Sequence, residues 1–160
     1  MHPDHVTEPP ARPLPPLVLD TNVLLDWLVF QDPSAAALDL AIRSGARQWI
    51  ATVAMREELE HVLTREHLMA RQKYPGLSLA TWNRWAQLVE PATTTWPSAM
   101  RCTDPDDQKF IDLALQHGAV LLSRDRAVLR LARAGRTRGV RILTPSAWAA
   151  SNSENLAVNG

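Results

Sequence analysis

The feature that most constrains the fold is a short apolar run that ends in a charged residue. Leu17 to Leu19 are apolar, Asp20 follows them, and the chain becomes apolar again from Val23. A continuous apolar run is typical of a central strand of a parallel sheet, which is buried on both faces. Since an aspartate is almost never fully buried without a partner, its place at the end of such a strand needs an explanation.

The rest of the chain alternates between strand and helix patterns. Further short apolar runs predict strands at 49–53, 119–122 and 140–143. Apolar periodicity and capping residues predict helices over 22–29, 33–44, 53–66, 79–89, 104–117, 126–135 and 144–150. Strands that alternate with helices in this way predict a parallel sheet between two helical layers, a three-layer α/β/α sandwich.

The length and composition are those of one folded unit. The chain has 160 residues, of which 46% are hydrophobic, so a single domain can bury roughly 70% of its unfolded surface. We expect this domain over residues 17–150, between disordered tails at the proline-rich segment 1–16 and at the small, polar segment 151–160. The single cysteine, Cys102, excludes an internal disulfide and a thiolate metal cluster. The sequence lacks both a membrane-spanning apolar run and an export signal, so we expect a cytoplasmic protein without a membrane partner.

The charges are unevenly distributed although the formal net charge is zero. Seven arginines lie between Arg124 and Arg141 against a single acid, Asp125, whereas acids dominate 57–60 and 104–107. The arginines fit either a solvated surface or a surface that faces phosphate groups beside an acidic site. The tryptophans at helical positions likewise fit either the core or base stacking.

Four acids are expected to meet at one edge of the sheet. Asp20 and Asp125 follow two of the strands, Glu58 borders the apolar face of its helix, and Asp107 faces inward from the first turn of another. A position at a helix N-terminus, as a cap or beside the helix dipole, could alone explain Asp20, Asp107 or Asp125, and it explains Asp104 well. Together, however, the four charges would repel one another strongly unless a hard divalent cation such as Mg²⁺ or Mn²⁺ lies between them.

The segments that carry these acids resemble a known family. VLDTNVLL, EELEHVL, DPDDQKFIDLAL and LLSRD are similar, in order and rough spacing, to the four acidic motifs of the PIN-domain metal-dependent ribonucleases, over about residues 17–144. The likeness is greatest to the bacterial toxin components of toxin–antitoxin pairs. It implies one or two Mg²⁺ or Mn²⁺ ions on the catalytic residues Asp20, Glu58, Asp107 and Asp125, with Thr21, Asn22, Asp104 and Ser123 orienting them.

The resemblance also implies a substrate and partners. RNA would be hydrolysed by a metal-activated water, a chemistry that needs no nucleophilic side chain, and an antitoxin and a second copy of the chain would be partners. Arg124 and Arg126 flank Asp125 and are candidates to bind RNA phosphates, although solvated arginines explain them equally well.

Two other classes of α/β protein, receiver domains and dehalogenase-type phosphatases, also place an aspartate at a strand end. A receiver domain needs a lysine at a late strand end, and neither Lys73 nor Lys109 is at one. A dehalogenase-type phosphatase needs a second aspartate where this chain has Asn22. The closer alternative is a PIN fold that binds RNA or regulates without turnover.

Overall fold

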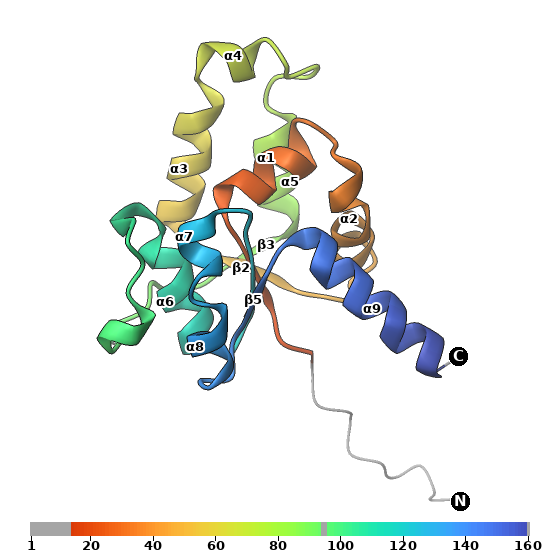
Figure 1. Cartoon of the computed structure of the whole chain (residues 1–160). Coiled ribbons are helices and arrows are strands. Elements are labelled where there is room, and N and C mark those ends of the chain that lie inside the picture. The colour runs from red at the N-terminus through yellow and green to blue at the C-terminus, as the bar shows by residue number, and fades with distance from the viewer. Residues whose placement is uncertain (1–13, 94–95, 160) are drawn as a thin grey trace, which may run out of the picture.

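Five short parallel strands form the centre of the molecule (Figure 1). The computed structural model describes residues 14–93 and 96–159, with side chains as far as residue 152, so most of the expected tail at 1–16 lies outside the described residues. The strands pair in the order β3-β2-β1-β4-β5. Their bounds are β1 Leu17–Leu19, β2 Trp49–Ala51, β3 Ala86–Leu88, β4 Val120–Leu122 and β5 Arg141–Leu143.

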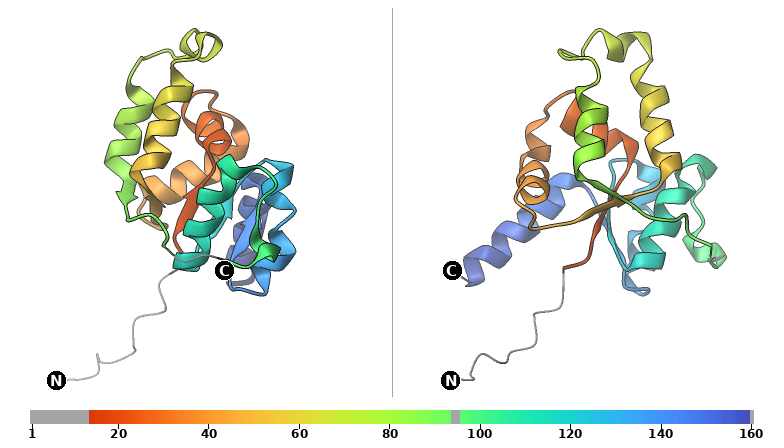
Figure 2. Two further views of the ribbon diagram at one scale, coloured as in Figure 1. Left: turned by 90° about the vertical axis from the view of Figure 1, so that its left-hand side faces the viewer. Right: turned by 180° about the vertical axis from the view of Figure 1, so that it is seen from behind.

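Helices cover both faces of this sheet, and the expected three-layer α/β/α architecture is confirmed. Figures 1 and 2 show α6 and α8 on one side of the sheet and α2 and α9 on the other. The α-helices are α1 Thr21–Leu28, α2 Ala36–Arg43, α3 Val53–Leu63, α4 Glu66–Met69, α5 Leu77–Trp85, α6 Gln108–His117, α7 Arg126–Leu129, α8 Ala132–Arg136 and α9 Pro145–Asn159. Short 3₁₀ turns occur at Pro33–Ala35, Ser98–Met100 and Pro105–Asp107. In the described part of the chain, no helix is both long and apolar enough to cross a membrane.

The core explains why the central strands are continuously apolar. All residues of β1, β2 and β4 are buried, so these strands have no solvent-facing side. Trp49 of β2 packs edge-to-face between Trp27 and Trp82, at centroid distances of 5.5 and 5.8 Å. Trp27 and Trp82 are therefore core residues rather than platforms for bases.

The sheet contains one strand that the sequence pattern did not predict. We expected a helix over 79–89, but α5 ends at Trp85 and the chain continues directly as β3. Because β3 is the outermost strand and its residues are half-buried or exposed, it has no apolar run that would distinguish it from a helix end. It is held by parallel pairing with β2.

Other helix boundaries also differ from expectation. The helix expected over 53–66 ends at Leu63, where the Thr64 hydroxyl donates to the His61 carbonyl at 2.6 Å. The helix expected over 126–135 is divided into α7 and α8. The final helix continues to Asn159 and so includes most of the segment 151–160 that we expected to be disordered.

Candidate functional site

The carboxyl ends of β1 and β4 lie side by side and bring two of the expected acids together. Leu19 and Leu122 are register partners, so Asp20 follows β1 next to the segment that carries Asp125. Asp20 is only 3% exposed. The hydroxyl of Ser123 donates to Asp20 Oδ2 at 2.6 Å and accepts from the backbone N–H of Asp125 at 3.0 Å. Ser123 thus hydrogen-bonds to both acidic segments.

Asp107 and Asp104 complete a cluster of carboxylates around Asp125. Asp104, Asp107 and Asp125 each present an oxygen within 4.8 Å of the others. Asp104 also caps the 3₁₀ turn Pro105–Asp107, where it accepts from the Asp106 N–H at 3.0 Å. The sequence therefore places Asp104 correctly as a cap, and the fold brings its carboxylate close to two of the predicted ligands.

Helix capping does not explain Asp20 or Asp107. Asp125 accepts from the Ala127 N–H at 2.8 Å and so does cap α7. The side chains of Asp20 and Asp107 make no cap hydrogen bond, although they precede α1 and α6. Asp107 Oδ2 is buried without a hydrogen-bond partner. An unpartnered buried carboxylate oxygen is destabilising unless a ligand satisfies it.

The electrostatics of the site also favour a bound cation. Burial raises the pKa of Asp107 to about 7, and the neighbouring charges of Asp20, Asp125 and Asp104 add to this effect. Burial likewise raises the pKa of Asp20, against the opposing hydrogen bond from Ser123, while Asp125 and Glu58 contribute repulsion. These carboxylates therefore resist ionising together.

Glu58 lies at the edge of this cluster and has its own partners. The Thr21 hydroxyl donates to Glu58 Oε2. Lys109 Nζ donates to Glu58 Oε1 at 2.9 Å. Asn22, another of the expected orienting residues, is exposed in the first turn of α1.

Two residues near the site were missed by the sequence analysis. Lys109 was considered only as the strand-end lysine of a receiver domain. Its position two residues after Asp107, at the start of the same helix, already indicated that it could lie close to the acids. Asp26 is 6% exposed and interrupts the apolar run of residues 23–28, a position that already indicated a buried charge in need of a partner. Asp26 forms a salt bridge with Arg124, with Nε 2.5 Å from Oδ2 and Nη2 3.2 Å from Oδ1. Of the two predicted phosphate-binding arginines, Arg126 is exposed and Arg124 is held by Asp26.

The donor set fits a hard divalent cation. It consists of carboxylate oxygens, which are the ligands that small divalent cations prefer. The buried Asp107 Oδ2 supplies an oxygen that a cation would satisfy. The structure thus provides an acidic group able to bind a metal, with Asp107 and Asp125 at its centre and Asp104 beside them.

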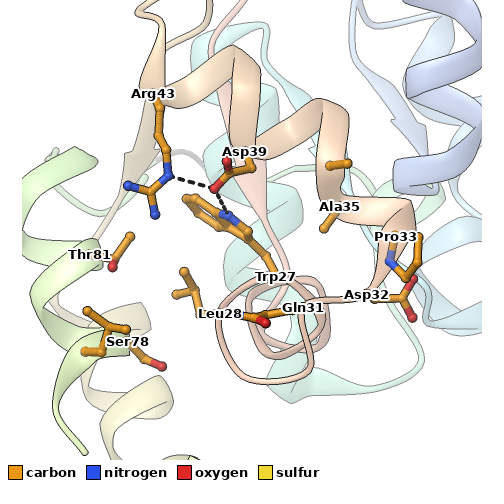
Figure 3. Close-up of a pocket in the computed structure, with 12 residues that line it drawn as sticks. Trp27, Leu28, Gln31, Asp32, Pro33, Ala35, Asp39, Arg43, Ser78 and Thr81 are labelled. Atoms are coloured by element: carbon orange, nitrogen blue, oxygen red, sulfur yellow. Dashed lines mark hydrogen bonds and ion pairs between the residues drawn. The ribbon is translucent and has the colours of Figure 1, made fainter. Parts of the chain in front are cut away.

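A separate pocket of about 350 Å³ lies among α1, α2 and α5 (Figure 3). Trp27 Nε1 and Arg43 Nε both donate to Asp39 Oδ1 at 2.7 Å inside it. Ser78 and Thr81 of α5 lie on the other side of this pocket. Its lining includes none of the four predicted metal ligands.

An α/β/α fold with acids at the carboxyl ends of adjacent strands is thus the class of structure that this chain adopts. A family model of the PIN domain matches residues 16–127, and the chain belongs to the PIN domain family. The match begins just before β1 and extends into α7, so it includes Asp20, Glu58, Asp107 and Asp125. PIN domains are generally nucleases, and the acidic group described above accords with such an activity. No curated protein matches the chain.

Proposed function

We propose that this protein is an endoribonuclease that depends on Mg²⁺ or Mn²⁺ and hydrolyses phosphodiester bonds of RNA. The observation that carries the proposal is the buried, unpartnered Oδ2 of Asp107 among three other acids. A cation relieves both the missing hydrogen bond and the repulsion.

The chain's own residues have distinct tasks in this mechanism. Asp20, Asp107 and Asp125 hold one or two cations, with Glu58 at the edge of the site. Ser123 keeps Asp20 and the Asp125 segment in register through its two hydrogen bonds. A bound divalent cation activates water and neutralises charge on the phosphodiester. No side chain has to act as a nucleophile.

The proposal extends to the biological role and to the partners. The resemblance of the motifs to bacterial PIN toxins supports a role as the toxin component of a toxin–antitoxin pair, with an antitoxin protein as partner and a homodimer as the working form. Exposed arginines next to the acidic site support RNA as the substrate. Arg126 remains the better of the two expected phosphate ligands, because Arg124 already has a carboxylate partner.

The direct test is cleavage of an end-labelled single-stranded RNA by the purified protein with Mn²⁺, Mg²⁺ or EDTA. We expect cleavage with metal, none with EDTA, and none with Asp20→Asn or Asp107→Asn. Asp106→Asn is the matched control, because Asp106 lies on the same turn as Asp107 but is exposed. Metal binding without cleavage would favour a PIN fold that binds RNA without turnover, and absence of both would contradict the metal site itself.

The toxin role has a separate test. Induced expression of the wild-type protein in a bacterial host should arrest growth and cause degradation of cellular RNA, whereas expression of Asp20→Asn should do neither. Growth arrest by both the wild type and Asp20→Asn would show that the arrest does not result from nuclease activity.

A further inference from the structure

A groove runs between α8 and β5, outside the acidic site. Its volume is about 410 Å³, and it is lined by Ala132, Arg136, Arg141, Ile142 and Leu143. β5 is the outermost strand at the opposite edge of the sheet from β3, and α8 packs beside it (Figure 1). The groove therefore combines an apolar floor with two guanidinium groups, and both of these arginines are exposed.

The groove belongs to a strongly basic surface. The exposed arginines of the segment that carries α7, α8 and β5 are Arg126, Arg130, Arg133, Arg136, Arg138 and Arg141. Within the described residues, no carboxylate forms a salt bridge with any of them. Arg43 and Arg124, by contrast, are each paired with an aspartate. The basic surface therefore keeps its charge available for an anionic ligand.

One lining residue of the groove, Leu143, lies beside the strand end that carries the acidic site. The backbone N–H of Ser123 donates to the carbonyl of Leu143 at 3.1 Å, and Leu143 lines the groove. The same Ser123 bonds Asp20 and the Asp125 backbone through its hydroxyl. From Leu143 the groove extends along β5 to Arg141, a path of two residues or roughly 7 Å in a strand. The groove therefore lies one strand away from the acidic segments.

We infer that the α8–β5 groove binds the single-stranded RNA next to the scissile phosphate, with Arg136 and Arg141 on its phosphates and a base against Ile142 and Leu143. This inference rests on the proposed function, which supplies RNA as the substrate. Alternating phosphate and base contacts are the usual recognition of single strands, because a duplex hides the faces of its bases. The groove offers both kinds of contact within one volume.

The test is RNA binding in EDTA, where cleavage plays no part. Fluorescence anisotropy with a labelled single-stranded RNA is measured from low to moderate salt for the wild type and for Arg136→Ala/Arg141→Ala. The control is Arg65→Ala/Arg84→Ala, which removes the same charge from two exposed arginines. Arg65 is the N-cap residue of α4, and Arg84 lies on α5, which leads into β3 at the other edge of the sheet. A melting curve for each variant confirms that it is folded.

We expect the groove variant to bind more weakly and with a smaller salt dependence. Loss of two phosphate contacts lowers the slope of log Kd against log salt by about 1.4, since each contact with a single strand contributes about 0.7. The control should keep the wild-type slope. A weaker affinity for Ile142→Ala, a variant with unchanged charge, would further support the base contact.

The result is independent of catalysis. A protein that cleaves nothing but shows the expected change in slope supports the groove and contradicts the nuclease. Equal slopes in the groove variant and the wild type overturn the inference, and an acidic protein segment then becomes the ligand that suits these arginines. If the groove and control variants lose RNA affinity and salt slope to the same extent, the inference is overturned as well, because the weaker binding would then follow from net charge alone.

Discussion

The ammonium group of Lys109 lies 2.9 Å from a carboxylate oxygen of Glu58, so the acidic site contains a cation of its own. The two residues are 51 positions apart and come from α6 and α3. The other Glu58 oxygen accepts from Thr21. Glu58 is thus fully partnered, whereas Asp107 Oδ2 has no hydrogen-bond partner. Because Asp107 Oδ2 lacks the partners that Glu58 has, we expect a bound cation to stabilise Asp107 more than Glu58.

Replacing this internal cation should change metal affinity and stability in opposite directions. Lys109→Gln leaves the acidic cluster one charge more negative, so we expect tighter Mn²⁺ binding by calorimetry. The same change removes an ion pair and should lower the metal-free free energy of unfolding by about 1 kcal/mol. Lys73→Gln is the control, because Lys73 is exposed on a distant loop. Weaker Mn²⁺ binding by Lys109→Gln would show instead that the metal site needs Lys109 to position Glu58.

The pH dependence of stability should identify Asp107. Its folded pKa of about 7 lies above the ordinary 3.8, so the folded state binds this proton more tightly than the unfolded state. The contribution of Asp107 to stability is therefore full below pH about 4 and is lost as the pH rises through about 7. In EDTA, the difference between urea midpoints at pH 5 and pH 8 should shrink in Asp107→Asn and persist in Asp106→Asn. The same difference in both variants would assign the pH dependence to another group.

Metal addition should stabilise the folded protein through the same acids. At a Mn²⁺ concentration about one hundred times Kd, the free energy of unfolding should rise by about 2.7 kcal/mol. Asp107→Asn should lose most of this gain, although in EDTA it should be at least as stable as the wild type, because repulsion is relieved. Glu57→Gln is the control, because Glu57 is exposed on the same helix as Glu58, and this variant should keep the full stabilisation by Mn²⁺. A lower melting temperature of Asp107→Asn in EDTA would mean that Asp107 supports the fold rather than a metal.

The pair of Asp26 and Arg124 should be important for stability. Arg124→Met leaves the buried Asp26 without its charged partner, which should cost about 1–3 kcal/mol. Asp26→Asn in the Arg124→Met background should recover part of this loss, and denaturant unfolding of the complete double-mutant cycle measures the coupling. Arg126→Met is the matched control. If Arg124→Met is as stable as the wild type but binds RNA with a smaller salt slope, Arg124 is a phosphate ligand rather than a structural residue.

The parts of the fold that local sequence encodes could be predicted. β1 and β4 follow from continuous apolar runs, and the end of α6 follows from Gly118, which adopts the left-handed conformation that favours glycine (φ 57°). Asp104 as a cap also follows from its local pattern. The convergence of Asp20 and Asp125 could be predicted because parallel strands end at one edge.

The rest depends on contacts between distant residues. β3 is a strand because β2 pairs with it, and its own side chains do not specify this. The partners of Asp26 and Glu58 lie 98 and 51 positions away. A pattern of hydrophobicity contains no information on which charges meet across such separations, so the pairing of Lys109 with Glu58 and that of Asp26 with Arg124 could only be found in the folded structure.

The hydrogen bond from Ser123 also determines how Asp20 can coordinate a cation. Since Oδ2 of Asp20 accepts the Ser123 hydroxyl at 2.6 Å, one lone pair of this oxygen is already engaged, which would favour coordination of a cation through Oδ1. Ca²⁺ takes about six to eight oxygens in flexible geometry and often binds carboxylates through both oxygens, whereas Mg²⁺ requires about six ligands in near-ideal octahedral geometry. A single serine hydroxyl would thus favour a small octahedral ion over Ca²⁺ by limiting the denticity of the acid beside it.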